Sequence, residues 1–120
     1  ALPRLTSQNF LSFHLWTPNS PLEQEAFGIW QPTENSPPIT PSFFFVPLLA
    51  FGPKGTRLGY GKGYYDKTFA KISKGCNIKT IGLAFSWAFC KTLTSEDHDI
   101  LLDAVVTEKE ILSFSKVQTL

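Results

Sequence analysis

The chain has 120 residues, of which 42% are hydrophobic and 18% charged, a composition that indicates a folded protein and excludes a disordered segment. The formal net charge of +1 argues against a general polyanion-binding surface, so binding of phosphate groups is expected to be local. The longest apolar run, residues 43–51, is interrupted by Pro47 and is far too short to span a membrane. We therefore expect one domain over residues 1–120, with neither a nucleic-acid nor a membrane partner.

The first 41 residues predict short strands joined by extended connections. The opening "ALPRL" is typical of a strand inside a fold, and the chain contains no methionine, so we expect an N-terminal portion of the gene product to precede it. Residues 9–16, "NFLSFHLW", predict a second short strand. Residues 22–41 are rich in proline and are interpreted as an extended connection with little regular structure. Trp30 in this connection is either a core side chain or a platform for a ligand.

The second part of the chain has the rhythm of strand, loop, helix and strand. Residues 43–51 predict a strand covered on both faces, with Pro47 at a bulge or at its end. Tyr65, Phe69 and Ile72 recur at helical spacing, and Gly75 follows as a stop signal. Residues 80–87 predict the next strand. This rhythm predicts an α/β fold, a layered sheet that is mixed or mostly parallel with flanking helices.

The last part of the chain predicts one more strand and a helix. Residues 104–107, "AVVT", are a strand candidate. Thr107 and Glu110 have the spacing of a capping box and predict a short terminal helix. The two cysteines, Cys76 and Cys90, are too few for a disulfide framework and lack metal-ligand spacing, so we expect buried or idle thiols and a cytoplasmic protein.

The stretch "RLGYGKGYYD", residues 57–66, is the candidate functional segment. Its alternating glycines, Gly59, Gly61 and Gly63, can aim backbone N–H groups at an anion, and the helix that follows brings the positive end of its dipole to the same place. The spacing matches neither the Walker nor the dinucleotide-binding pattern, and an ordinary flexible loop is the alternative. The sequence thus predicts a phosphate-binding loop over residues 57–66.

Read whole, "VPLLAFGPKGTRLGYGKGYYD", residues 46–66, resembles the signature of the 5-formyltetrahydrofolate cyclo-ligases, also called methenyltetrahydrofolate synthetases. The segments "IGLAF" and "EDHDILLDAVVT" further along are similar to that family as well. The resemblance implies an enzyme that uses ATP and Mg²⁺ to cyclise 5-formyltetrahydrofolate to 5,10-methenyltetrahydrofolate, releasing ADP and phosphate. It also implies that this chain is the C-terminal portion of a larger single domain, since the family has a preceding region with basic residues for ATP and a carboxylate for folate. Gly52 departs from the family, in which an acidic residue often follows the phenylalanine.

The same resemblance implies a role for each residue of the loop. Arg57 and Lys62 are the expected catalytic residues, the first as a forked phosphate contact and the second as a mobile positive charge. The alternatives are a surface salt bridge for Arg57 and a solvated side chain for Lys62. The expected ATP-binding residues are Arg57, Leu58, Gly59, Tyr60, Gly61, Lys62, Gly63, Tyr64 and Tyr65. The expected substrate-binding residues are Tyr60, Gly61, Lys62, Gly63 and Tyr64.

Two carboxylates are expected at the metal. By resemblance, Asp66 and Asp99 are the Mg²⁺ ligands, in keeping with the preference of this hard cation for carboxylate and phosphate oxygens. For Asp66 the alternative is a helix-start carboxylate stabilised by the dipole. His98 is interpreted as structural, and Glu96 and Asp97 as solvated side chains.

Two other classes of function remain open from the sequence alone. One is a noncatalytic nucleotide- or RNA-binding α/β module, with tyrosines stacking on bases and Arg57, Lys62 and Lys67 on the backbone. The other is an α/β enzyme that acts on a phosphorylated sugar. The favoured interpretation is the cyclo-ligase, expected as a monomer whose partners are its small-molecule substrates.

Overall fold

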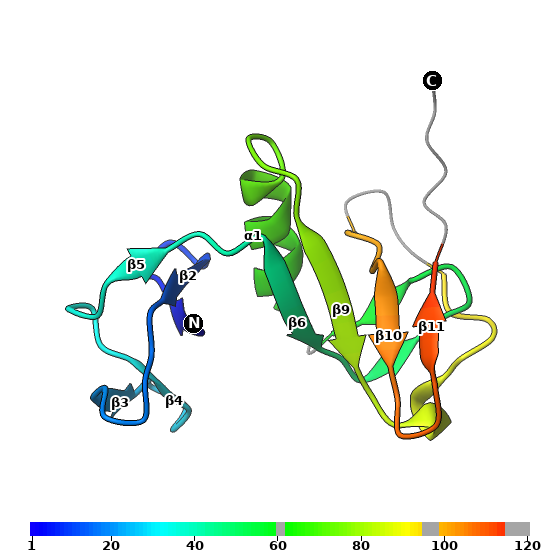
Figure 1. Cartoon of the computed structure of the whole chain (residues 1–120), viewed down its shortest axis with the longest axis horizontal. Helices are drawn as coiled ribbons and strands as arrows, with labels where there is room; N and C mark the ends of the chain where they lie inside the picture. The colour runs from blue at the N-terminus through cyan, green and yellow to red at the C-terminus, as the bar shows by residue number, and fades with distance from the viewer. Residues whose placement is uncertain (60–61, 95–98, 115–120) are drawn as a thin grey trace. The chain divides into compact units, whose positions relative to one another are not determined.

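The structure is a computed structural model that describes residues 1–59, 62–94 and 99–114. The chain divides into two compact units, Ala1–Pro41 and Ser42–Leu120 (Figure 1). The interpretation of residues 1–120 as a single domain stays a prediction.

The first unit is built from five short strands. β1 (Leu2–Leu5), β2 (Leu11–His14) and β5 (Pro38–Ile39) form an antiparallel sheet in the order β1-β2-β5. β3 (Leu22–Gln24) and β4 (Trp30–Pro32) form an antiparallel hairpin. The two strands predicted from "ALPRL" and from residues 9–16 are therefore confirmed.

The interpretation of residues 22–41 as an irregular connection is wrong, because this segment contains β3, β4 and β5. A local turn explains the hairpin. Oε1 of Glu25 accepts hydrogen bonds from the amides of Phe27 and Ile29, at 2.7 and 3.0 Å, and Gly28 takes the positive φ of 87° that the turn requires. Proline content alone was misleading, since prolines are tolerated at strand ends and edges. Trp30 is 62% exposed, so its interpretation as a core side chain is also wrong.

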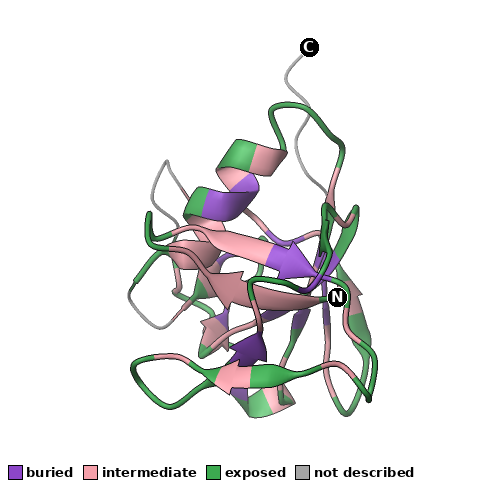
Figure 2. Cartoon of the chain, turned by 90° about the vertical axis from the view of Figure 1, so that its left-hand side faces the viewer, coloured by how far each residue is buried: buried purple, intermediate pink, exposed green. Residues whose placement is uncertain are grey.

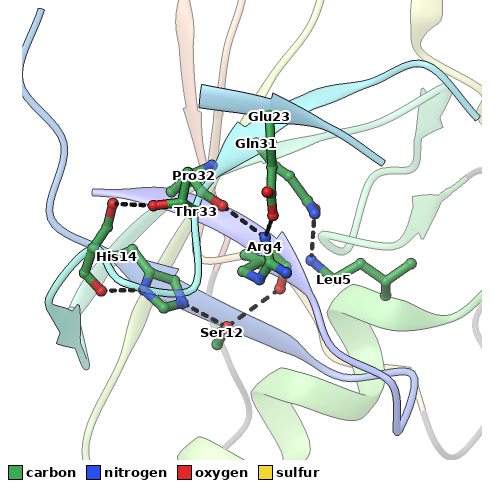
Figure 3. Close-up of polar contacts among 9 residues, drawn as sticks. Arg4, Leu5, Ser12, His14, Glu23, Gln31, Pro32 and Thr33 are labelled. Carbon is green, nitrogen blue, oxygen red and sulfur yellow. Dashed lines mark hydrogen bonds and ion pairs between the residues drawn. The ribbon is translucent and has the colours of Figure 1, made fainter. Parts of the chain in front are cut away.

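Polar side chains connect the strands of the first unit (Figure 3). Arg4 Nη1 donates to Glu23 Oε1 and, at 2.9 Å, to the carbonyl oxygen of Pro32. His14 is buried, and its Nδ1 lies 2.8 Å from the carbonyl oxygen of Ser36, which can only accept, so Nδ1 carries the proton. In the neutral ring Nε2 is then left to accept from the Ser12 hydroxyl at 2.8 Å. Because both ring nitrogens are bound within the first unit, we interpret His14 as a structural residue.

The second unit contains a mixed four-stranded sheet in the order β11-β10-β9-β6 (Figure 1). β6 (Phe43–Pro47), β9 (Lys79–Leu83) and β10 (Ala104–Val106) run parallel, and β11 (Ile111–Ser113) runs antiparallel to β10. α1 (Tyr64–Ile72) lies in the connection between β6 and β9. The predicted α/β fold with a mixed sheet is confirmed, with one α-helix among the described residues.

Two shorter elements and one correction complete this unit. β7 (Ala50–Phe51) and β8 (Arg57–Leu58) form a hairpin, and η1 (Ser86–Ala88) is a 3₁₀ turn after β9. The predicted terminal helix is wrong. The Thr107 hydroxyl oxygen instead accepts from the amides of Lys109 and Glu110, at 3.2 and 3.1 Å, and so closes the turn between β10 and β11. The spacing of a capping box also fits a tight turn. Residues 111–113 pair with β10 as a strand, so this segment forms the turn and not the helix.

The core of the second unit lies between α1 and one face of the sheet. Phe44 and Val46 on β6 are buried, and the rings of Phe44 and Phe69 meet edge to face with centroids 5.0 Å apart. α1 carries buried, half-buried and exposed residues along its length (Figure 2), as expected for a helix that packs on one side. Phe43 and Phe45 alternate with these and are exposed, so the prediction of a strand covered on both faces is wrong for the described residues. Within those residues we find no helix with both the length and the apolarity needed to cross a bilayer.

Candidate functional site

The β7–β8 hairpin brings Arg57 to the start of the glycine-rich segment. Phe51 pairs with Arg57, and the turn is closed by a hydrogen bond from the Gly52 amide to the Thr56 carbonyl oxygen at 2.9 Å. The Thr56 hydroxyl donates to the carbonyl oxygen of Leu93 at 3.2 Å and lies where a side chain at position 52 would begin. Glycine at position 52 is therefore a packing requirement of this hairpin.

Arg57 is held by the protein on three sides. Nη1 donates to the carbonyl oxygen of Pro47 at 3.0 Å, and Nη2 lies 3.6 Å from Oδ2 of Asp66. The guanidinium carbon lies 5.5 Å from the centroid of the Tyr65 ring, within the range of a cation–π contact. A Cβ at position 59 would lie 2.7 Å from Arg57 Nη1, so Gly59 leaves the room that the guanidinium occupies. The side chain of Arg57 is only 6% exposed.

Asp66 lies where the loop becomes a helix. Gly63 is the N-cap of α1 with a φ of 70°, a left-handed conformation that glycine adopts without strain, and Asp66 follows in the first turn. A carboxylate at this position interacts favourably with the positive end of the helix dipole. Oδ1 of Asp66 also accepts from the amide of Ile100 at 3.2 Å. One carboxylate thus connects the arginine, the helix and the segment that carries Asp99.

The other residues singled out from the sequence are exposed, half-buried or outside the described residues. Lys62, Gly63 and Leu58 are exposed, whereas Tyr64 and Tyr65 are half-buried. Tyr60 and Gly61 lie outside the described residues, as do Glu96, Asp97 and His98. The structure therefore brings together Arg57, Tyr65 and Asp66 in one cluster, with Lys62 in the exposed loop beside it.

The carboxylate of Asp66 is the type of ligand that a magnesium ion prefers. Mg²⁺ in phosphoryl-transfer sites is commonly bound by one or two carboxylates together with substrate phosphates and waters. Among the residues that the structure describes, Oδ1 of Asp66 is bound by the Ile100 amide and Oδ2 lies near Arg57, so lone pairs remain on both oxygens. Ile100 immediately follows Asp99. Over residues 1–59, 62–94 and 99–114, no group of three or more His, Cys, Asp and Glu side chains is placed to hold a metal. The assignment of Asp66 and Asp99 as metal ligands therefore stays a prediction.

A cavity of about 830 Å³ lies in the second unit at the N-terminal end of β9. Its lining includes Lys54, Ser73, Cys76, Thr80 and Asp99. Asp99 therefore lines the cavity, and the next residue, Ile100, both lines it and binds Asp66. Both cysteines are free thiols, but neither is buried: Cys76 is exposed and Cys90 is half-buried.

Three polar groups that position the Arg57–Asp66 cluster were not found by sequence reasoning. Two are backbone groups, the carbonyl oxygen of Pro47 and the amide of Ile100, which every sequence has and no motif distinguishes. The third is the hydroxyl of Thr56, which is 37 residues from its acceptor Leu93. For Thr56 the sequence does contain one signal, which is the glycine at position 52: a larger residue there would overlap the Thr56 hydroxyl.

The fold and the site define an α/β protein in which a glycine-rich loop leads from a hairpin arginine to a carboxylate at a helix start. Comparison with known proteins makes this specific. The model of the 5-formyltetrahydrofolate cyclo-ligase family matches residues 1–108. The 5-formyltetrahydrofolate cyclo-ligase of Haemophilus influenzae is 35% identical over 105 residues, covering 83% of this chain and 56% of the relative. A probable 5-formyltetrahydrofolate cyclo-ligase of Caenorhabditis elegans is 32% identical over 119 residues, covering 97% of this chain and 55% of the relative.

A solved structure agrees with these relatives. The NMR structure of 5,10-methenyltetrahydrofolate synthetase from Aquifex aeolicus superposes with a TM-score of 0.73 at 33% identity, covering 98% of this chain and 59% of that protein. The chain belongs to the 5-formyltetrahydrofolate cyclo-ligase family. It spans a little more than half the length of the Haemophilus influenzae and Caenorhabditis elegans relatives.

Proposed function

We propose that this protein takes part in the ATP- and Mg²⁺-dependent cyclisation of 5-formyltetrahydrofolate to 5,10-methenyltetrahydrofolate, with release of ADP and phosphate. Membership of the cyclo-ligase family carries the proposal. The site geometry supports it, because the loop that ends at Asp66 has the parts that a triphosphate needs: exposed loop residues, a helix N-terminus and a carboxylate for a cation.

The reaction explains why such parts are needed. The formyl group is an amide and a poor electrophile. In the proposed reaction its oxygen attacks the γ-phosphorus of ATP and ADP leaves. The neighbouring folate nitrogen then attacks the activated carbon and gives up its proton, and the carbon–oxygen bond breaks with loss of inorganic phosphate. Catalysis of phosphoryl transfer consists mainly of positioning and charge neutralisation.

The structure suggests different roles for the two predicted catalytic residues. Lys62 is exposed in the loop, which leaves its ammonium group available to a transferring phosphoryl group. Arg57 is almost fully buried and already bound to Pro47 and Asp66, so we assign it the positioning of Asp66 and of the loop, with its remaining N–H groups toward phosphate. We assign binding of the triphosphate to Gly59, Gly61 and Gly63, and a further contact with the nucleotide to Leu58.

The tyrosines and the carboxylates complete the assignment. Tyr60, Tyr64 and Tyr65 are assigned to the ATP and folate region, with Tyr65 also in contact with Arg57. Asp66 and Asp99 would hold Mg²⁺, which when bound neutralises charge on the phosphates. We further propose that the protein acts as a monomer in the cytoplasm.

Turnover tests the proposal directly. The gene product that contains this chain is incubated with 5-formyltetrahydrofolate and MgATP, and methenyltetrahydrofolate absorbance is followed, with ATP omitted as the control. We expect product only with ATP. A folded protein that binds ATP and forms no product would refute the proposal, and salt-sensitive RNA binding in its place would favour the noncatalytic module.

Substitution of Arg57 then tests the site. Arg57→Ala removes the assigned phosphate contact together with the contacts to Pro47 and Asp66. A charge-assisted hydrogen bond to phosphate is worth about 1.5–3 kcal/mol, which corresponds to roughly a tenfold to hundredfold loss of ATP-dependent rate. Lys71→Ala is a matched control, because it removes an exposed positive charge from the last turn of α1. Unchanged ATP affinity and turnover in Arg57→Ala would show that the assigned role is wrong.

A further inference from the structure

Two exposed aromatic side chains lie just beyond the end of β9. This strand ends at Leu83, and η1 follows it. The rings of Phe85 and Trp87 are nearly parallel, with an interplanar angle of 9° and centroids 5.9 Å apart, which is the geometry of an offset stack. Phe85 is 60% exposed and Trp87 is 78% exposed. These two rings, which we call the aromatic pair, therefore present a flat apolar surface to solvent.

The backbone that carries the aromatic pair is fixed at both ends. The Ser86 amide donates to Oε1 of Glu108 at 2.6 Å, and the Ser86 hydroxyl donates to Oε2 at 3.3 Å. At the other end of η1 the Cys90 amide donates to the Phe51 carbonyl oxygen at 2.8 Å, and the rings of Phe51 and Phe89 have centroids 5.5 Å apart. Exposed rings on a fixed backbone are organised before a ligand arrives, which reduces the cost of binding.

The same segment is connected to the arginine of the candidate site. Pro47 and Leu83 are partners in the register of β6 and β9, and the Pro47 carbonyl oxygen accepts from Arg57 Nη1 at 3.0 Å. Phe51, which binds the Cys90 amide, pairs with Arg57 in the β7–β8 hairpin. Both connections lie within the second unit, so the aromatic pair and the glycine-rich loop belong to one part of the fold.

The order of the elements indicates what lies beyond β9. The chain runs from β6 through the glycine-rich loop and α1 to β9, and the carboxyl ends of the two parallel strands lie at one edge of the sheet (Figure 1). In α/β sheets, ligands bind outside the carboxyl ends of the strands. The phosphates of a nucleotide lie at the N-terminus of the helix, and its nucleoside lies beside the end of the next strand. Here that strand is β9, and the aromatic pair follows it.

The chemistry of the aromatic pair is that of a surface for a flat ring. Phenylalanine has no polar side-chain atom and tryptophan has one N–H group, so the pair attracts an apolar ring face and not a phosphate. Nucleobases stack on aromatic side chains of this kind. The pterin ring of folate is also flat, but it reacts at the γ-phosphate, which is the end of ATP farthest from the base. The position beyond β9 therefore favours the base.

We propose that the aromatic pair is the stacking platform for the adenine base of ATP. The base stacks on the exposed face of Trp87, Phe85 supports Trp87 from the other side, and the triphosphate extends toward Arg57 and the glycine-rich loop. This inference rests on the proposed function for the identity of the nucleotide.

Two ligands that differ only in the nucleoside separate base stacking from phosphate binding. Titration calorimetry on the gene product that contains this chain measures the dissociation constants of MgATP and of magnesium tripolyphosphate, with folate omitted. Trp87→Ala is expected to weaken MgATP binding roughly fivefold to hundredfold, the range for a base that loses its aromatic partner. The affinity for tripolyphosphate is expected to stay unchanged. Trp87→Phe keeps a ring and is expected to remain within about threefold of the parent protein.

Phe43→Ala is the matched control for this titration. Phe43 is an aromatic residue of the same sheet and is 51% exposed, but it pairs with Lys79 at the amino end of β9, opposite the end that carries the aromatic pair. Its substitution is expected to leave the affinity for MgATP unchanged. Circular dichroism establishes that each variant is folded. If Trp87→Ala does not fold, Phe85→Leu takes its place, with the same selective loss of MgATP binding expected.

Fluorescence identifies the ring that binds. This chain contains three tryptophans, so the difference in emission between the parent protein and Trp87→Phe isolates Trp87. We expect MgATP to quench this emission and tripolyphosphate to leave it unchanged. Quenching by 5-formyltetrahydrofolate in place of MgATP would overturn the assignment, because the platform would then belong to the pterin ring.

Three further outcomes would overturn the inference. The first is an unchanged affinity for MgATP in Trp87→Ala. The second is an equal loss of affinity for MgATP and tripolyphosphate, which would show that the aromatic pair only supports the loop. The third is a ligand-free protein in which acrylamide does not quench Trp87, since another part of the protein would then cover it.

Turnover distinguishes this inference from the proposed function. Product formation by the parent protein, together with an unchanged affinity for MgATP in Trp87→Ala, would refute the stacking platform alone. Binding of MgATP that depends on Trp87, without any product from 5-formyltetrahydrofolate, would refute the proposed function alone.

Discussion

The contact between positions 52 and 56 makes the sharpest test of how the structure places Arg57. Gly52 and Thr56 face each other across the turn between β7 and β8. A Cβ at position 52 would overlap the Thr56 hydroxyl oxygen and would lie 3.0 Å from the Leu93 carbonyl oxygen, which is backbone and cannot rotate away. Gly52→Ala is therefore predicted to destabilise the protein by about 1–3 kcal/mol through overpacking.

A double-mutant cycle with Thr56→Ala tests this overlap, because that substitution removes the Thr56 hydroxyl. Thr56→Ala loses the hydrogen bond to Leu93 and is predicted to cost about 1 kcal/mol. In the double variant the added methyl group takes space that the hydroxyl has vacated, so the combined loss is predicted to be smaller than the sum by about 1–2 kcal/mol, a coupling in the range found for residues in contact. The family resemblance implies an acidic residue at position 52 in other members. In this chain such a residue would likewise need the space that the Thr56 hydroxyl occupies.

Urea denaturation measures all four proteins, with the midpoint and slope compared at one temperature. Gly75→Ala is the matched control, because nothing lies within 4 Å of a Cβ at that position, and its effect is expected to stay within about 0.5 kcal/mol. Additive losses in the double variant would refute the reasoning, since they would mean that positions 52 and 56 do not share the space.

Three further predictions concern the loop, the arginine and the 3₁₀ turn. Gly63→Ala forces a side chain into a φ of 70° and is predicted to cost about 1–2 kcal/mol in the free energy of unfolding measured in urea; a change no larger than that of Gly75→Ala would contradict the N-cap geometry. Arg57→Lys keeps the charge but loses the planar contact to Pro47, and it is predicted to lower the thermal midpoint measurably, whereas an unchanged midpoint would mean that a point charge suffices. The hydrogen bond from the Ser86 amide at 2.6 Å holds the pKa of Glu108 below its ordinary value of 4.5, so Glu108 adds stability that is present above pH 4.5 and is lost as the pH falls through the lowered pKa. Glu108→Gln is therefore predicted to lower the thermal midpoint at pH 7 and to converge with the parent protein in acid, and a difference that persists in acid would show another cause.

Local patterns predicted much of the second unit. Apolar runs of strand length and a helical spacing at Tyr65, Phe69 and Ile72 predicted β6, α1 and β9 in the correct order. The passage of the glycine-rich segment into a helix was also predicted correctly. These features depend on side-chain periodicity and on glycine, which act within a few residues.

Patterns failed where two structures share the same local signal. The proline-rich residues 22–41 suit an irregular connection as well as the β3–β4 hairpin, and the hydrogen bonds of Glu25 decided for the hairpin. Thr107 and Glu110 suit a helix cap as well as a β-turn, and β10 decided for the turn by pairing with residues 111–113.

The sequence by itself determined the α/β rhythm, the glycine-rich loop and the family resemblance, because each is written in consecutive residues. Only the tertiary structure decided what Arg57 touches, since its partners are Pro47, Tyr65 and Asp66, which lie on β6 and α1. It also decided that Phe43 and Phe45 face outward while Phe44 and Val46 face α1. A run of five apolar or proline residues does not say which face is covered, because coverage depends on elements that pack there from elsewhere in the fold.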